Sequence, residues 1–396
     1  MSKSGLTEVR ASPMTTWRGW FAVITVGLGT FTLVTNEFLP VGLLTQMSHE
    51  FRVSEGTAGT MMTVPGLVAA VTAPTFTVAA GRIDRRLVLI AMSILFTLAD
   101  ILGALAPNFA VMLIARFLLG LGIGGFWAIG ASVGPRLVSS VHAARATAIV
   151  FSGVSIASVL GVPGGALIGG LYGWRTAFAA TAVLGAIALV LQLVLLPKLN
   201  VDAPVTWAQL LKVLRGRTAR AGLVALLVLV IGQFAAYTYI APFLHSTTGA
   251  STQMISTLLL VYGAAGIVGN FTVGLALRRH LKSTAVALMV VIGVCAIGLP
   301  ILGAIPPAVV IVLTVWGLAY GAVPIALQTW IFRANPEQVE TGSALYISIF
   351  QFSVASGALL GGVIVDAAGT RAAMITGAVL AIAAAASLLS GRSNRP

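Results

Sequence analysis

The sequence has few charged residues and almost no cysteine. Only 8% of its 396 residues are charged and 58% are hydrophobic, whereas about a quarter of an ordinary soluble domain is charged. Cys295 is the only cysteine, which excludes an intrachain disulfide and a CxxC metal or redox motif. The four histidines fall near predicted loops without metal-ligating spacing. We therefore expect an integral membrane protein that uses no metal and no other cofactor.

Acidic residues are also scarce, with ten Asp and Glu against 23 Lys and Arg and a formal net charge of +13. The basic residues are spread among short loops between apolar segments, so the charge does not indicate a nucleic-acid partner. Most of them fall in loops on one side of the predicted membrane, and only Arg52, Arg175 and Arg371 fall in loops on the other. By the positive-inside rule, both ends of the chain are expected in the cytoplasm. The first apolar segment is too long for a cleaved signal peptide and is expected to stay as an anchor.

Apolar segments long enough to cross a bilayer recur along the whole chain. At about 20 residues per span, they predict an all-α integral membrane protein with twelve transmembrane helices. The predicted spans are residues 17–45, 57–80, 87–106, 109–132, 146–171 and 175–196, followed by 221–245, 252–277, 284–304, 308–333, 342–365 and 371–391. The most polar internal stretch, residues 197–220, is predicted to be a cytoplasmic linker between an N-terminal half, 1–196, and a C-terminal half, 221–396.

The two halves repeat one another in sequence. Gly-Ala-Leu-Ile-Gly-Gly at 165–170, followed by Arg175, recurs as Gly-Ala-Leu-Leu-Gly-Gly at 357–362, followed by Arg371. Further landmarks recur in the same order at nearly the same spacing. This pattern predicts two parallel six-helix repeats, with a substrate site between the halves near the middle of the membrane.

Glu37, Asp100 and Arg116 are ionisable residues inside predicted spans. A charged side chain at membrane depth costs at least a few kcal/mol, so it persists where it faces a protein interior or a watery cavity. Glu37 is our first candidate for a proton-binding site, unless it reaches water or headgroups at the outer end of its helix. Arg116 keeps its charge and is expected to interact with Asp100 or Glu37, unless it snorkels to the interface. We predict that these three residues couple transport to protons.

Neutral polar and aromatic side chains inside the spans suit an uncharged polar or amphipathic ligand. The predicted substrate-binding residues are Asn36, Gln233, Tyr237, Tyr239 and Gln328. Further side chains of this kind are Tyr262, Tyr320 and Gln351. For each of these residues, a role as an interfacial anchor or a contact between helices is the alternative.

The loop after the second predicted span places Asp84 beside Arg85 and Arg86. On so short a turn, the carboxylate can make charge-assisted hydrogen bonds or hold a helix end. We predict a gating or structural role for the three residues. Positive-inside topology alone is the alternative for the arginines.

The fifth predicted span has a small residue at every fourth position, among them Gly161 and Gly165, with Pro163 between them. Such a series presents a flat face that another helix can approach closely, and the proline can bend the span. We therefore expect close helix packing here. A role in preventing leak between the halves is compatible with this packing.

These features together resemble the major facilitator superfamily, and within it the twelve-span drug:proton antiporter branch. The resemblance covers nearly the whole chain. Residues 84–86 look like a shortened form of the family's loop motif that lacks a usual glycine. Arg116 matches the arginine of the fourth-span motif, which the family links to proton coupling. Residues 161–165 are similar to the fifth-span antiporter motif, although Val162 stands where a glycine is usual.

Three further stretches, residues 36–44, 160–164 and 237–243, look like the bacterial sugar-efflux and arabinose-transporter-like permeases. Chloramphenicol exporters share much of this pattern. The resemblance implies efflux by proton antiport with a proton site at Glu37, in the bacterial inner membrane. It also implies a monomer.

We therefore expect a transporter and not an enzyme. The expected activity is proton-coupled antiport that exports small sugars or sugar-like solutes by alternating access. The expected partners are the small solute, protons and the lipid bilayer. Chloramphenicol-type or multidrug efflux by proton antiport is the alternative, and uptake by proton symport and a non-transporting membrane sensor are further alternatives.

Overall fold

The computed structural model describes residues 16–81, 83–199, 216–334 and 339–390, which form a helical bundle without a β-strand. Twelve helical segments among them are long and apolar enough to cross a membrane, as the sequence predicts. The N-terminal helices are α1 Thr16–Phe51, α2 Glu55–Ala58, α3 Thr60–Ala79, α4 Arg85–Ala104, α5 Phe109–Val133, α6 Ala143–Ile156, α7 Val162–Tyr172 and α8 Trp174–Leu195. The C-terminal helices are α10 Arg217–Tyr237, α11 Ile240–Thr248, α12 Thr252–Thr272, α13 Gly274–Leu302, α14 Pro306–Ala334, α15 Val339–Ala368 and α16 Thr370–Ser390.

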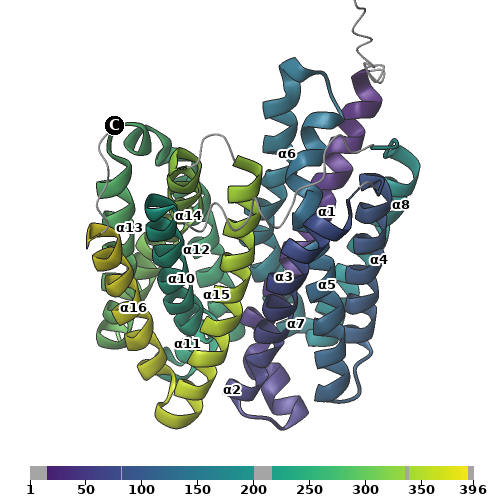
Figure 1. The fold of residues 1–396 in the computed structure, drawn as a ribbon. Helices are drawn as coiled ribbons and strands as arrows, with labels where there is room; N and C mark the ends of the chain where they lie inside the picture. The colour runs from purple at the N-terminus through teal and green to yellow at the C-terminus, as the bar shows by residue number, and fades with distance from the viewer. Residues whose placement is uncertain (1–15, 82, 200–215, 335–338, 391–396) are drawn as a thin grey trace, which may run out of the picture.

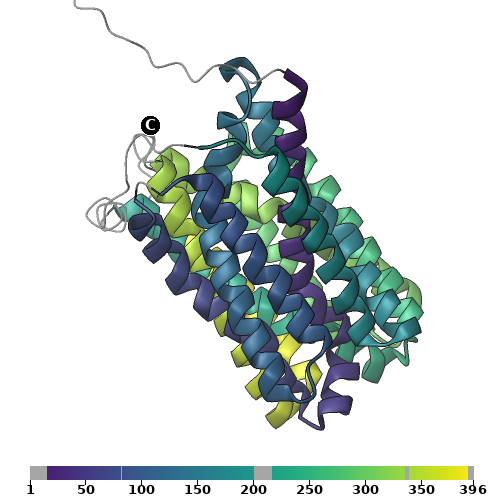
Figure 2. The same ribbon diagram turned by 90° about the vertical axis from the view of Figure 1, so that its right-hand side faces the viewer.

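The helices lie in two groups, α1 to α8 on one side and α10 to α16 on the other (Figure 1). We call these groups the N half and the C half. Helix α1 begins and α16 ends at the same end of the bundle, the terminal end, and α2 lies at the opposite end, the α2 end. The start of α1 and helix α6 project beyond the other helices at the terminal end (Figure 1, Figure 2). Of the predicted linker 197–220, residues 200–215 lie outside the described residues, and α10 begins at Arg217.

Two spans that the sequence predicts as continuous helices are interrupted next to prolines. The fifth consists of α6, a π-helical segment at Ala157–Gly161, and α7, which has Pro163 at its start. The seventh is divided into α10 and α11, with Pro242 in the first turn of α11. Proline has no N–H to donate within a helix, but the first N–H groups of a helix need no internal partner. Helix α1 nevertheless continues through Pro40 to Phe51, so the surrounding packing decides whether a proline ends a helix.

The halves meet along two pairs of helices. Helix α15 lies along α3, and α12 packs against α7 and the π-helical segment. Glycines bring the backbones together at both places. A Cβ on Gly66 would lie 2.9 Å from the carbonyl oxygen of Gln351, and a Cβ on Gly263 would lie 2.3 Å from that of Ser158. A larger residue at either glycine would force the halves apart.

The series of small residues in the fifth span faces α1. A Cβ on Gly161 would lie 2.2 Å from the hydroxyl oxygen of Thr35, and a Cβ on Gly165 would lie 2.1 Å from a methyl group of Leu39. The close helix approach expected from the sequence is therefore an approach of α1 within the N half. It fixes the part of α1 that carries the central polar residues.

Candidate functional site

Glu37 lies on α1 and faces the protein, with 4% of its surface exposed. The side-chain amide of Gln351 on α15 donates a hydrogen bond of 2.9 Å to the Oε1 atom of Glu37. The carboxylate therefore contacts the other half, and it does not extend to water at the end of its helix. Because burying an unpaired carboxylate is costly, a donor at this position stabilises its charged form.

Arg116 on α5 is 1% exposed and lies next to α1. Its Nη1 atom donates to the backbone oxygen of Asn36 at 2.9 Å and to the side-chain Oδ1 at 3.1 Å. The guanidinium carbon lies 4.8 Å from the ring centre of Phe178. Arg116 therefore does not snorkel to the interface, and its charge interacts electrostatically with Asp100 and Glu37 while its hydrogen bonds go to Asn36. The structure thus places Asn36, a predicted substrate ligand, as the partner of Arg116.

Asp100 on α4 is fully buried beside the same arginine. Its Oδ1 atom accepts a hydrogen bond of 3.0 Å from the hydroxyl of Thr181 on α8. Its Oδ2 atom is buried without a hydrogen-bond partner among the described residues. The nearby positive charge of Arg116 compensates this carboxylate. Sequence reasoning missed Thr181, because a threonine in an apolar span gives no signal of its partner.

In the C half, Gln233 connects three helices. Its side-chain nitrogen donates to the hydroxyl of Tyr262 on α12 at 2.9 Å, and its oxygen accepts from the indole nitrogen of Trp316 on α14 at 2.8 Å. Tyr237 stacks on Tyr262 with ring centres 4.8 Å apart. Gln233 and Tyr237 thus belong to one site, in which Gln233 orients the rings. Sequence reasoning missed Trp316.

Phe38, next to Glu37, joins α1 to these rings. It stacks on Phe234 of α10 with ring centres 5.6 Å apart and an angle of 18° between the rings. Phe234 in turn meets several rings edge-on. We call the whole group the aromatic cluster, and its members are Phe38, Phe234, Tyr237, Tyr262, Trp316, Tyr320, Tyr346 and Phe350. The cluster puts flat apolar surfaces beside the buried carboxylate.

Two hydroxyl groups of the aromatic cluster have no hydrogen-bond partner among the described residues. They are the buried hydroxyl oxygens of Tyr320 on α14 and Tyr346 on α15. Tyr346 also stacks on Phe350, with ring centres 6.1 Å apart. Buried polar atoms in proteins are nearly always paired, so these two hydroxyls are available to a polar ligand. The site therefore combines ring faces, neutral hydrogen-bonding groups and one carboxylate.

Tyr239 and Gln328 lie apart from this group. Tyr239 is fully buried, its hydroxyl donates to the backbone oxygen of Ala358 at 2.8 Å, and the same hydroxyl lies against Gly59 at the α2 end. Gln328 is half-buried on α14, about two turns from Tyr320 towards the terminal end. The structure therefore brings together Gln233 and Tyr237 but not the other two predicted ligands of the C half.

Asp84 caps the N-terminus of α4. Its carboxylate accepts from the backbone nitrogen of Arg86 at 2.9 Å and from that of Leu199 at 2.8 Å. The backbone nitrogen of Arg85 donates to the Leu199 oxygen at 3.1 Å, and the Arg86 guanidinium donates to the Leu193 oxygen at 2.7 Å. These bonds tie α4 to the end of α8 within the N half. The expected gating role would act through this attachment.

At the α2 end, Asp366 joins the two halves. Its carboxylate accepts from the hydroxyl of Ser54 at 2.6 Å and from the backbone nitrogen of Gly56 at 2.9 Å. Glu50 and Arg175 form an ion pair nearby within the N half, with side chains 47% and 40% exposed. Asp366 is thus a polar contact between α15 and α2, far along α15 from Gln351.

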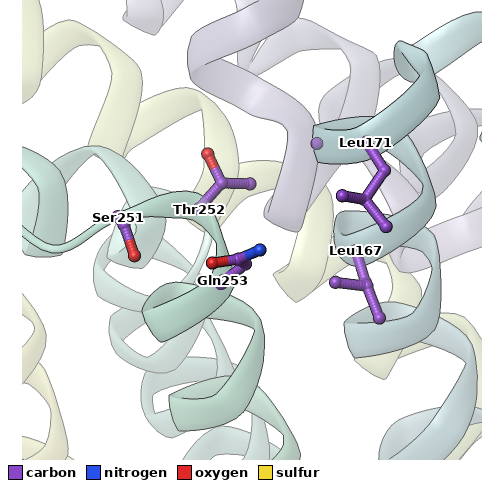
Figure 3. Close-up of a pocket in the computed structure, with 6 residues that line it drawn as sticks. Leu167, Leu171, Ser251, Thr252 and Gln253 are labelled. Carbon is purple, nitrogen blue, oxygen red and sulfur yellow. The ribbon is translucent and has the colours of Figure 1, made fainter.

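A separate surface pocket of about 230 Å³ lies between α7 and the start of α12 (Figure 3). Leu167 and Leu171 face residues 251–253 across it, and Gly170 lies against Thr252. The six residues that line this pocket include no ionisable side chain. We therefore place the candidate site at Glu37 and the aromatic cluster.

Comparison with known proteins adds the family context. The model of the Major Facilitator Superfamily matches residues 26–346. The transcription regulatory protein OpdE of Pseudomonas aeruginosa is 35% identical over 382 residues, which are 95% of each chain. The purine ribonucleoside efflux pump NepI of Escherichia coli strain K12 is 33% identical over 380 residues, 96% of each chain. The crystal structure of the human organic anion transporter MFSD10 has a TM-score of 0.70 at 16% identity and covers 94% of this chain and 99% of that one.

Proposed function

The chain belongs to the major facilitator superfamily and is a transporter, and we propose that it exports a small polar solute in exchange for protons. The solute crosses the bacterial inner membrane as the halves alternate around the site between them. Both chain ends lie in the cytoplasm, so the α2 end faces outward. The pH gradient supplies the free energy, and one chain without a cofactor contains the whole site.

The position of Glu37 is the observation that carries this proposal. It is a carboxylate on the N half that is hydrogen-bonded to the C half, at the side of the aromatic cluster. A proton from outside neutralises Glu37 and favours the state that releases solute outward. Loss of that proton to the cytoplasm restores the charged carboxylate and resets the transporter.

Arg116 and Asp100 support this proton site without leaving the N half. Arg116 holds the backbone of α1 through Asn36, one residue before Glu37. Its positive charge stabilises charged Glu37, and Asp100 balances the arginine when Glu37 is neutral. The three groups are thus neutral in sum when Glu37 is protonated, and when Glu37 is charged the hydrogen bond from Gln351 stabilises the added negative charge.

The aromatic cluster favours a solute with a flat ring as well as hydroxyl groups. Ring faces bind a planar group by stacking, and the hydroxyls of Tyr320 and Tyr346 suit its polar edge. A purine ribonucleoside combines a sugar with such a ring, and the similar protein NepI is named as an efflux pump for that class. We therefore propose a ribonucleoside-like solute ahead of free sugars and chloramphenicol-like drugs.

A membrane sensor is the second candidate function. The observation that favours it is the 35% identity to OpdE, which is named as a transcription regulatory protein. A sensor would bind its ligand at the same site without net flux. Flux measurements therefore separate the two functions.

The test uses everted membrane vesicles with an acidic lumen. Labelled adenosine, arabinose and chloramphenicol are each added outside, and their accumulation and the accompanying proton release are recorded. We expect adenosine-dependent proton release with wild type and none with Glu37→Gln. Glu50→Gln is the matched control, because it changes a carboxylate of the same helix in an exposed ion pair.

Full proton-driven accumulation by Glu37→Gln would refute the assignment of the proton site. Binding of adenosine by purified protein without flux of any of the three solutes would favour the sensor. Movement of solute out of the acidic lumen, in the same direction as the protons, would indicate symport.

A further inference from the structure

Gln351 is the C-half residue that touches the proposed proton site. It is 3% exposed on α15, and its side-chain nitrogen lies 2.9 Å from the Oε1 atom of Glu37. The α15 backbone at this residue also packs directly on Gly66 of α3. We propose that Gln351 is a positioning residue that transmits the charge of Glu37 to α15 and so couples the proton to the movement of the halves. This inference rests on the proposed function, in which Glu37 carries the transported proton.

The strength of this hydrogen bond depends on the proton. An amide N–H that donates to a carboxylate makes a charge-assisted bond, which is about twice as strong as a neutral one. A proton on Glu37 leaves at most a neutral bond. The difference is large here because both side chains are buried and water does not replace the lost partner. The attachment of α15 to α1 is therefore firm when Glu37 is charged and weak when it is protonated.

The other groups that face Glu37 do not provide this connection. Arg116 on α5 is held by Asn36 within the N half, and Asp100 on α4 lies with it. Tyr320 on α14 faces Glu37 from the C half, and its hydroxyl has no hydrogen-bond partner among the described residues. Gln351 is thus the side chain through which a change of charge on Glu37 reaches the C half by a hydrogen bond.

A second bond on α15 provides a matched comparison. The hydroxyl of Ser348, about one turn before Gln351, donates to the backbone oxygen of Ala70 on α3 at 2.8 Å. It also joins the two halves, but its acceptor is a carbonyl that gains no proton in the working pH range. Near its middle, α15 thus carries one proton-sensitive bond and one proton-insensitive bond to the N half, apart from the Asp366 contact at the α2 end. Removal of either weakens the interface, but only removal of the first should change coupling.

The experiment compares Gln351→Met with Ser348→Ala in everted vesicles. Methionine keeps the length of the side chain and removes the donor. Accumulation of labelled adenosine driven by the pH gradient should fall about tenfold in Gln351→Met, the factor expected when a charge-assisted bond is lost. Exchange of labelled for unlabelled adenosine at equal pH should stay within about twofold, because the ligand site is intact.

The pH profile adds a readout that a purely structural role would not move. The Gln351 donor stabilises charged Glu37, so the pH of half-maximal accumulation should rise by about one unit in Gln351→Met, following the same factor. Ser348→Ala should keep the wild-type profile. If Gln351→Met does not insert, the isosteric Gln351→Glu serves instead, and its second carboxylate should shift the profile in the same direction.

The outcomes distinguish failure of the role of Gln351 from failure of the proposed function. A wild-type pH profile and wild-type coupling in Gln351→Met, with Glu37→Gln uncoupled, would overturn the role of Gln351 alone. An equal change in Ser348→Ala would also overturn it, because the effect would then be loss of interface. Proton-driven accumulation by Glu37→Gln, or no flux of adenosine, arabinose or chloramphenicol by wild type, would overturn the proposed function and this inference with it.

Discussion

Replacement of Arg116 by glutamine should destabilise the N half strongly. The guanidinium is 1% exposed and makes two hydrogen bonds to Asn36. Its positive charge also interacts electrostatically with the buried carboxylate of Asp100. Glutamine is neutral and shorter, so it removes the charge and can remake at most part of the hydrogen bonding. Asp100 is then buried without a compensating charge.

The size of the effect follows from these contacts. Hydrogen bonds to a charged group contribute about 1.5–3 kcal/mol each. Breaking a buried charged pair by removal of one member costs about 3–5 kcal/mol, mostly because the other charge is left behind. We expect a loss in that range, and a fall in melting temperature of roughly 6–10 °C. Asp100→Asn in the same chain should restore about half of the loss, because it removes the uncompensated charge and keeps an oxygen for Thr181.

The measurement is the melting temperature of purified protein in detergent for the wild type, Arg116→Gln, Asp100→Asn and the double variant. Arg175→Gln is the control, because it removes an arginine from an exposed ion pair and one hydrogen bond to the Ala106 oxygen, which together should cost at most about 2 kcal/mol. The reasoning is wrong if the double variant melts below Arg116→Gln, or if the two arginine variants lose the same stability. Additivity of the two single changes would mean that Arg116 and Asp100 are not coupled.

Three further predictions concern contacts of the C half. Asp366→Ala removes the acceptor that ties α15 to α2, so maleimide should label a cysteine at the buried position Ala58 (Ala58→Cys) severalfold faster in a cysteine-free background, and equal labelling would contradict the contact. Gly263→Ala places a Cβ 2.3 Å from a carbonyl oxygen of the other half, so transport should fall to background. The control Gly274→Ala meets open space and should keep wild-type transport. Trp316→Phe keeps an aromatic ring but loses a hydrogen bond of about 1 kcal/mol, which should raise the half-saturation concentration about fivefold at unchanged maximal rate.

The class of the protein and its spans were predictable from the sequence because they depend on local composition. A bilayer requires each spanning segment to satisfy its own backbone hydrogen bonds, so about 20 apolar residues in a row become a helix whatever lies beside them. All twelve predicted spans correspond to helical segments of the structure. The ends of the helices were less predictable. Helix α1 continues to Phe51 and α10 begins at Arg217, because capping and packing set helix ends.

Interruptions inside spans were only partly predictable. Prolines mark both interruptions, since Pro163 follows the π-helical segment and Pro242 follows the break between α10 and α11. Pro40 nevertheless lies within a continuous helix. The same missing N–H is tolerated where neighbouring helices hold the chain straight, and those neighbours are not visible in a local stretch of sequence.

In the site, the sequence identified the costly residues but not their partners. Glu37, Asp100 and Arg116 stand out because charge is rare in apolar spans. Their hydrogen bonds go to Gln351, Thr181 and Asn36. All three partners lie on a span far along the chain from the residue they bind. The rotation of each helix about its own axis decides which side chains meet, and the packing of the helices fixes that rotation.

The sequence by itself determined that this protein is a duplicated bundle of membrane helices with a few buried charges, because hydropathy and repeats are properties of the chain. Only the tertiary structure decided that Glu37 faces the C half and that Tyr237 belongs to the aromatic cluster while Tyr239 lies at the α2 end. Tyr237 and Tyr239 are two residues apart, but the break between α10 and α11 lies between them. Such a break changes the direction of a side chain by an amount that only the packed helices define.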